Sequence, residues 1–213
     1  MNFEKNIKTI KNQSKQAQLV VVTKNQSLQN INNIYKIGER NFGENKVQDL
    51  LKKQQELPND INWHMIGHLQ TNKVKLITPF IHMIQSVDSL KLIKKINSCG
   101  EQDERIINCL IQIKIAEEDT KYGFSIKEAK EILTTDILSK YRYISVQGIM
   151  GMASFSTNTN QIKNEFKLMK QLFDACKNKY PILSMGMSND YIIAYQAGSN
   201  MLRVGSAIFQ KTY

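Results

Sequence analysis

Short apolar segments alternate with amphipathic helical segments from one end of this chain to the other, and this alternation restricts the fold more than any other feature. The segments that read as strands are residues 19–24, 41–42, 62–66, 82–86, 109–115, 144–149, 182–184 and 201–204. Strands that alternate with helices form parallel sheets, because each helix returns the chain to the start of the next strand. About eight such units close into a (β/α)8 TIM barrel. The sequence therefore predicts an α/β barrel.

Capping residues mark the boundaries of several predicted helices. Ser27 precedes one helix, and Gly38 follows it. The tetrapeptide SIKE at residues 125–128 has the pattern of a capping box. The longest predicted helix covers residues 160–179, where apolar side chains recur every three or four positions.

One more helix is predicted ahead of the first strand. Phe3, Ile7 and Ile10 fall on one face of that segment, which we expect to cover the bottom of the barrel. No linker rich in glycine or serine, shift of composition or internal repeat divides the chain. We therefore expect a single domain that covers residues 1–213.

The cysteines and the amino terminus indicate the compartment. Cys99, Cys109 and Cys176 are far apart and form no C-x-x-C pair, so neither a disulfide framework nor a zinc knuckle is suggested. The first residues lack the apolar core of a secretory signal, and no apolar stretch reaches the length of a membrane span. We expect a soluble cytoplasmic protein that contacts no membrane.

The formal net charge of +10 raises the alternative of a nucleic-acid-binding protein. The lysines are spread along the whole chain, however, and no basic block or aromatic RNA-binding motif accompanies them. Solvated helix faces are the simpler interpretation. A nucleic-acid binder would show binding that depends steeply on salt concentration.

Lys24 ends the first predicted strand. Side chains alternate along a strand, so Val20, Val22 and Lys24 share one face. If that face points into the barrel, the amine emerges at the carboxyl end of the strand, where barrel enzymes place their sites. On this feature alone, a lysine that simply leaves the strand for water is the simpler interpretation.

The two last predicted strands supply groups that suit an anion. Arg203 would project toward the interior near the same end of the barrel, and Gly205 and Ser206 follow it directly. Ser188 lies in the preceding loop, SMGMSND, at the start of a predicted helix. In barrels, the loops after the seventh and eighth strands recurrently hold phosphate. Taken singly, Gly205 could be only a turn residue and Ser188 only a helix cap.

An amine on one side and a phosphate cradle on the other describe a site for pyridoxal 5′-phosphate (PLP), whose aldehyde and phosphate need these two groups. Asn45 follows the second predicted strand, where it could contact a cofactor or cap the next helix. His64 and His68 have the spacing of metal ligands on a helix, but they fall on a strand and a loop and lack a third ligand. We therefore predict no metal site.

Seven segments resemble, in order, the motifs of the pyridoxal phosphate homeostasis proteins, single-domain relatives of the alanine racemase barrel. They are VVTK (21–24), NFGENKVQ (41–48), WHMIGHLQTNK (63–73), QSVDS (85–89), GIM (148–150), LSMGMSNDY (183–191) and MLRVGSAIFQ (201–210). The resemblance covers nearly the whole chain. The combination of FGEN, IGHLQ-x-NK and SMGMS is highly specific.

The resemblance implies a barrel like the alanine racemase N-terminal domain, of PLP fold type III. It implies PLP bound as a Schiff base to Lys24, with an arginine near the pyridine nitrogen that matches Arg203. It also implies phosphate contacts that match Ser188, Gly205 and Ser206. The departures are Thr23 where serine is common, Asn189 where a second aspartate is common, Gln210 where glycine is common, and a short segment around residues 98–108.

Family members are regarded as carriers or regulators of vitamin B6, without established catalytic turnover. The resemblance thus predicts a cytoplasmic, monomeric protein that buffers PLP and delivers it through transient contacts with apo PLP-dependent enzymes. The alternative is a small PLP-dependent amino-acid racemase. Racemases of this fold take a tyrosine acid/base from a second domain, for which we expect no room after Tyr213.

Overall fold

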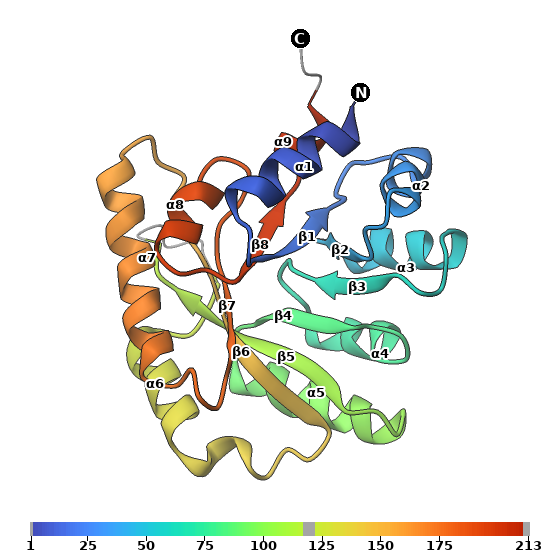
Figure 1. The fold of residues 1–213 in the computed structure, drawn as a ribbon. Coiled ribbons are helices and arrows are strands. Elements are labelled where there is room, and N and C mark those ends of the chain that lie inside the picture. Colours follow the sequence, from blue (N-terminus) through green and yellow to red (C-terminus); the bar gives the residue numbers. More distant parts are fainter. Residues whose placement is uncertain (1, 117–121, 211–213) are drawn as a thin grey trace.

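The computed structural model describes residues 2–116 and 122–210. Eight parallel strands form a closed barrel in which neighbours follow chain order and β8 pairs with β1 (Figure 1). The predicted (β/α)8 fold is therefore confirmed. The strands are β1 (Gln18–Val22), β2 (Asn41–Glu44), β3 (Asn62–Met65), β4 (Met83–Val87), β5 (Ile107–Lys114), β6 (Ile144–Met152), β7 (Ile182–Ser184) and β8 (Met201–Val204).

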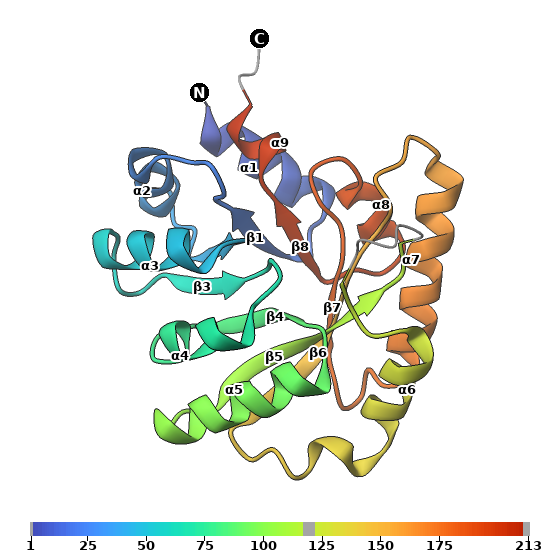
Figure 2. The ribbon, with the colours of Figure 1, turned by 180° about the vertical axis from the view of Figure 1, so that it is seen from behind.

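Helices surround the barrel on its outside, as the view from behind also shows (Figure 2). They are α1 (Phe3–Gln13), α2 (Leu28–Lys36), α3 (Val47–Glu56), α4 (Val74–Ile77), α5 (Leu90–Gln102), α6 (Ile126–Thr134), α7 (Thr159–Asp174), α8 (Tyr191–Gln196) and α9 (Ser206–Phe209), with short 3-10 turns η1 (Thr71–Lys73) and η2 (Asp136–Leu138). No helix within the described ranges is long and apolar enough to cross a membrane. The predicted domain, 1–213, also includes residues 1, 117–121 and 211–213, which lie outside the described residues.

Two of the predicted capping residues, Ser27 and Ser125, are found at the starts of the helices predicted from them. The hydroxyl of Ser27 accepts a hydrogen bond from the amide of Asn30 at the start of α2. Ser125 and Glu128 form the complete capping box of α6. The long helix α7 ends at Asp174, five residues before the predicted end at 179, because the chain turns there toward Pro181.

Two strand boundaries differ from the prediction in ways that affect the site. β1 ends at Val22, so Lys24 lies in a turn after the strand and not within it. β6 continues three residues beyond the predicted end at 149, because the long strand β5 still pairs with it at Lys114 and Met152.

Helix α1 lies beside the barrel wall and does not cover the bottom, contrary to our prediction. Its first residues lie next to α9 (Figure 1). There the Phe3 ring meets the Phe209 ring edge-on at 5.6 Å between centroids. The side-chain amide of Asn6 donates a hydrogen bond to the carbonyl oxygen of Ile208 at 2.9 Å. The apolar face of α1, with Ile7 and Ile10 buried, thus completes the outer layer of helices next to β8.

The barrel interior is filled by a small apolar cluster. Val20, Met83, Leu110, Met150 and Met201 are buried together and separate from the larger core between strands and helices. Val20 is paired in register with Arg203 of β8. The buried polar side chains of the interior therefore lie next to apolar residues. The low polarity of these surroundings strengthens their electrostatic interactions.

Candidate functional site

The predicted site residues lie at the carboxyl ends of four strands that are neighbours in the barrel, β7, β8, β1 and β2. Lys24 and Asn45 follow β1 and β2, Ser188 follows β7, Arg203 belongs to β8, and Gly205 and Ser206 follow β8. Parallel strands place these ends on one rim, so the six residues occupy one side of the mouth of the barrel. Lys24 is solvent-exposed there.

The loops after β7 and β8 meet at the hydroxyl of Ser188. Its oxygen accepts hydrogen bonds from the backbone amides of Gly205, at 3.1 Å, and Ala207, at 3.2 Å. Two backbone amides and a hydroxyl, groups of the kind that bind anions, therefore lie together here, with both amides bonded to the hydroxyl oxygen. The amide of Ala207 was missed from sequence, because a backbone donor leaves no trace in residue type.

Two glycines allow this arrangement. A Cβ atom on Gly205 would lie 3.0 Å from the carbonyl oxygen of Val22, so a side chain there would crowd the close approach of β8 to β1. Gly186 has a φ of 97°, and a Cβ there would lie 2.6 Å from the Cβ of Ala194. Helix α8 begins only at Tyr191, with Asp190 at its capping position, so Ser188 does not cap a helix.

Arg203 is buried, with 2% of its surface exposed. Its guanidinium donates to the hydroxyl oxygen of Ser184 at 2.6 Å and to the carbonyl oxygen of Gly151 at 2.9 Å. Burial lowers the pKa of Arg203 to about 10, and the charge of Asp190 opposes that shift. The group remains cationic at neutral pH, and both of these acceptors are uncharged.

A chain of buried hydrogen bonds continues from Arg203 across the barrel. The Ser184 hydroxyl donates to Gln85 Oε1 at 2.7 Å, and Gln85 Nε2 lies 3.0 Å from Nδ1 of His64. Burial, and then repulsion by His82, lower the pKa of His64 to about 3. A neutral imidazole therefore accepts from Gln85 and fixes the far end of the chain that orients Arg203.

His64 and His68, which have the spacing of metal ligands, lie in different surroundings. His64 is in the interior, whereas His68 Nδ1 lies 2.8 Å from Asp88 Oδ2 and its ring stacks on Tyr122 at 3.8 Å between centroids. Within residues 2–116 and 122–210, no three potential ligands among His, Cys, Asp and Glu gather in a metal-binding group.

Asn45 does not cap α3, because the residue at the capping position is Lys46 and it makes no side-chain capping bond. Gly67 packs directly on the backbone of Asn45, where a Cβ would lie 2.3 Å from the Asn45 oxygen. The partly buried Asn45 is thus held between the ends of β2 and β3, and the capping alternative is excluded.

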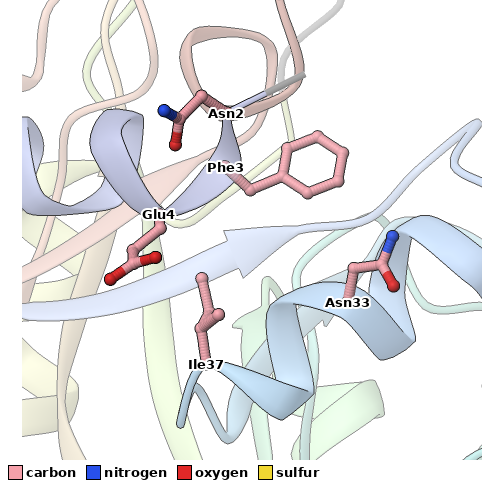
Figure 3. A pocket seen from close by; sticks show the side chains of 5 residues that line it. All are labelled: Asn2, Phe3, Glu4, Asn33 and Ile37. Atoms are coloured by element: carbon pink, nitrogen blue, oxygen red, sulfur yellow. The ribbon is translucent and has the colours of Figure 1, made fainter.

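A separate pocket of about 510 Å³ lies between α1 and α2, away from this rim (Figure 3). It is lined by Asn2, Phe3, Glu4, Asn33 and Ile37. None of the predicted site residues contributes to it.

The donors at the rim suit PLP in kind. Convergent amides around Ser188 fit a phosphate, and the buried guanidinium of Arg203 fits an acceptor such as a ring nitrogen. The amine of Lys24 is the nucleophile that an aldehyde needs.

The chain matches the family model described as alanine racemase, N-terminal domain, over residues 1–212. It is 38% identical over 195 residues to the pyridoxal phosphate homeostasis protein of Helicobacter pylori (strain ATCC 700392 / 26695), covering 91% of this chain and 87% of that protein. This chain belongs to the pyridoxal phosphate homeostasis protein family. The family member of Schizosaccharomyces pombe is 34% identical over 197 residues, which cover 90% of this chain and 82% of the relative.

Solved structures agree with this family assignment. PipY of Synechococcus elongatus PCC7942 without PLP superimposes with a TM-score of 0.90 at 28% identity, covering 98% of this chain and 100% of PipY. PipY with PLP bound gives a TM-score of 0.86 at 27% identity, with the same coverage. An alanine racemase of Clostridium difficile 630 shares the fold, with a TM-score of 0.79 at 18% identity over 99% of this chain and 57% of the racemase.

Proposed function

We propose that this member of the pyridoxal phosphate homeostasis protein family binds PLP and serves intracellular vitamin B6 homeostasis as a carrier or regulator. The relatives are named for PLP homeostasis and not for a reaction, and PipY has been seen with PLP bound. The observation in this chain that carries the proposal is the convergence of the Gly205 and Ala207 amides on the Ser188 hydroxyl. The proposed unit is the whole domain, residues 1–213.

Each proposed residue has a role that follows from its chemistry. The Lys24 amine holds the cofactor as a Schiff base, a C=N bond formed with its aldehyde as one water leaves. Ser188, Gly205 and Ser206 bind the phosphate through hydroxyl and amide donors, with the Ala207 amide beside them. The side chain of Asn45 contacts the cofactor from the end of β2.

Arg203 explains why a carrier is favoured over a catalyst. A guanidinium has donors and no acceptor, so next to the ring nitrogen it favours the unprotonated ring. PLP supplies an electron sink to enzymes, and that sink is weak when the ring nitrogen is unprotonated. The hydrogen bonds of Arg203 to Ser184 and Gly151 hold its guanidinium in one position in the barrel.

In this proposal, PLP can be delivered to other proteins because Lys24 is exposed. The exposed side chain of Lys24 leaves the linkage open to attack by an amine of another protein. We propose transfer to apo PLP-dependent enzymes through transient contacts, by a monomer in the cytoplasm. The absence of helices able to span a membrane within the described residues is compatible with that setting.

The test is a titration of the purified protein with PLP, followed by visible absorption of the Schiff base. After unbound PLP has been removed, we expect the wild type to be yellow and Lys24→Ala to be colourless. Lys46→Ala is the matched control, because Lys46 is also an exposed lysine and lies between β2 and α3, directly after Asn45. A colourless wild type, or a yellow Lys24→Ala protein, would reject the proposal.

A further inference from the structure

A buried ion pair contacts the residue that precedes Lys24. Lys53 of α3 and Glu44 of β2 form a salt bridge in which the side chains are 9% and 0% exposed. Lys53 falls on the buried face of α3 together with Val47 and Leu50. Lys53 is buried, whereas the lysines of the other described helices are exposed or partly exposed.

Both members of the pair bind the residue that precedes Lys24. The ammonium of Lys53 donates to the carbonyl oxygen of Thr23 at 2.8 Å. The hydroxyl of Thr23 donates to Glu44 Oε1 at 2.6 Å, and the amide of Asn45 donates to Glu44 Oε2 at 3.3 Å. The pair therefore ties together the ends of β1 and β2, each one residue before a proposed cofactor-binding residue.

Lys24 itself sits in a tight turn. The amide of Gln26 donates to the Thr23 carbonyl oxygen at 3.0 Å, which closes a turn over residues 23–26. Asn25 within it has a φ of 62°, a left-handed conformation that asparagine adopts more readily than most residues other than glycine. The Thr23 oxygen that closes the turn is the same atom that Lys53 binds.

Packing alone does not fix this turn. A cavity of about 320 Å³ lies behind it, lined by Asn25, Gln26 and Ser27 on one side and by Asp49, Lys52 and Lys53 on the other. Because the turn borders this cavity, its position depends on hydrogen bonds, and those of the Glu44–Lys53 pair add to the one that the Thr23 amide donates to the carbonyl oxygen of Gly43 at 2.9 Å.

A buried ion pair is also a poor device for stability alone. Removing two charges from water is expensive, and apolar residues of similar size in such places are often neutral or stabilising. A role in holding one geometry accounts better for the pair. Here that geometry is the turn that carries the amine.

We propose that Glu44 and Lys53 are positioning residues for Lys24, which hold the turn over residues 23–26 so that the amine meets the PLP aldehyde. The inference rests on the proposed function, since it concerns the residue that forms the Schiff base. Neither side chain touches the cofactor in this account. Both act through Thr23, by the contacts with its carbonyl and hydroxyl groups.

The test compares Lys53→Met, and the double variant Glu44→Gln with Lys53→Met, with the wild type. The double variant avoids leaving a carboxylate buried without a partner. The control is Lys11→Met. This substitution breaks a different ion pair with a buried carboxylate, the one between Lys11 in the last turn of α1 and Glu39. Urea unfolding establishes that each protein is folded before PLP is added.

The first readout is the rate at which PLP becomes linked to Lys24, measured by borohydride trapping. We expect a loss on the order of tenfold or more in both Lys53 variants, because misplacement by about 1 Å impairs attack. The second readout is binding of pyridoxamine 5′-phosphate, which has no aldehyde. We expect it to be unchanged, because the phosphate contacts stay intact, and we expect Lys53→Arg to restore part of the linkage rate.

Wild-type linkage rates in the folded double variant would overturn the positioning role. An equal loss in Lys11→Met, or an equal loss of pyridoxamine 5′-phosphate binding, would also overturn it, since either result indicates a general defect. A wild type that links no PLP would instead refute the proposed function itself.

Discussion

His64 should make the stability of this protein depend on pH in a way that a single substitution removes. The imidazole is fully buried, and burial lowers its pKa to about 3 from the ordinary 6.5. Below pH 6.5 the unfolded chain binds a proton at His64 that the folded protein does not bind. Folding is therefore disfavoured as the pH falls from 6.5 toward 3.

The magnitude follows from the two pKa values. Each unit of difference corresponds to about 1.4 kcal/mol, so at pH 5 the loss from His64 reaches roughly 2 kcal/mol. At pH 7.5 the contribution is close to zero. The pKa of His82 is also lowered by burial, but that residue is present in both proteins compared and its effect cancels to first order.

The assay is urea unfolding of the wild type and of His64→Asn at pH 7.5 and at pH 5. Asparagine retains an acceptor for Gln85, although it leaves a small void. The wild type should lose about 2 kcal/mol more than the variant between the two pH values. Equal losses would mean that His64 titrates as a solvated histidine, and the account of a dry polar chain behind Arg203 would be wrong.

Three further substitutions test the site. Ser188→Ala should weaken PLP binding by about 1.5–3 kcal/mol, the value of a hydrogen bond to a charged group, in an absorption titration, whereas pyridoxal without phosphate should bind as before. Gly205→Val should lower the free energy of unfolding by about 1–3 kcal/mol and weaken PLP binding, because its Cβ would lie 3.0 Å from the Val22 oxygen; an unchanged urea midpoint would contradict this. Ser184→Ala should cost about 1–3 kcal/mol in unfolding free energy, because one donor of Arg203 loses its acceptor, and it should shift the pH dependence of the absorption spectrum of bound PLP.

The positions of the strands could be predicted from the sequence because they depend on the local alternation of side chains. Most predicted strands match the structure closely, and β7 and β8 match at both ends. The end of β1 was placed two residues too late because Thr23 and Lys24 continue the alternation of side chains beyond Val22, where the strand ends. A hydrogen-bond register between strands is a property of the pair, and one strand's sequence does not contain it.

The Glu44–Lys53 pair was missed although a signal for it exists. Val47, Leu50 and Lys53 recur every three residues on α3, so a lysine stands on the apolar face of that helix. Its partner, Glu44, is nine residues earlier and in a different element, and only the packing of α3 on β2 brings them together. The position of α1 was mispredicted for a similar reason, since an amphipathic face does not say which surface will cover it.

The most direct measurement is the mass of the protein after incubation with PLP and borohydride, followed by peptide mapping. We expect one added reduced cofactor per chain, carried by the peptide that contains Lys24. Label spread over the many exposed lysines, or absent from Lys24, would contradict it.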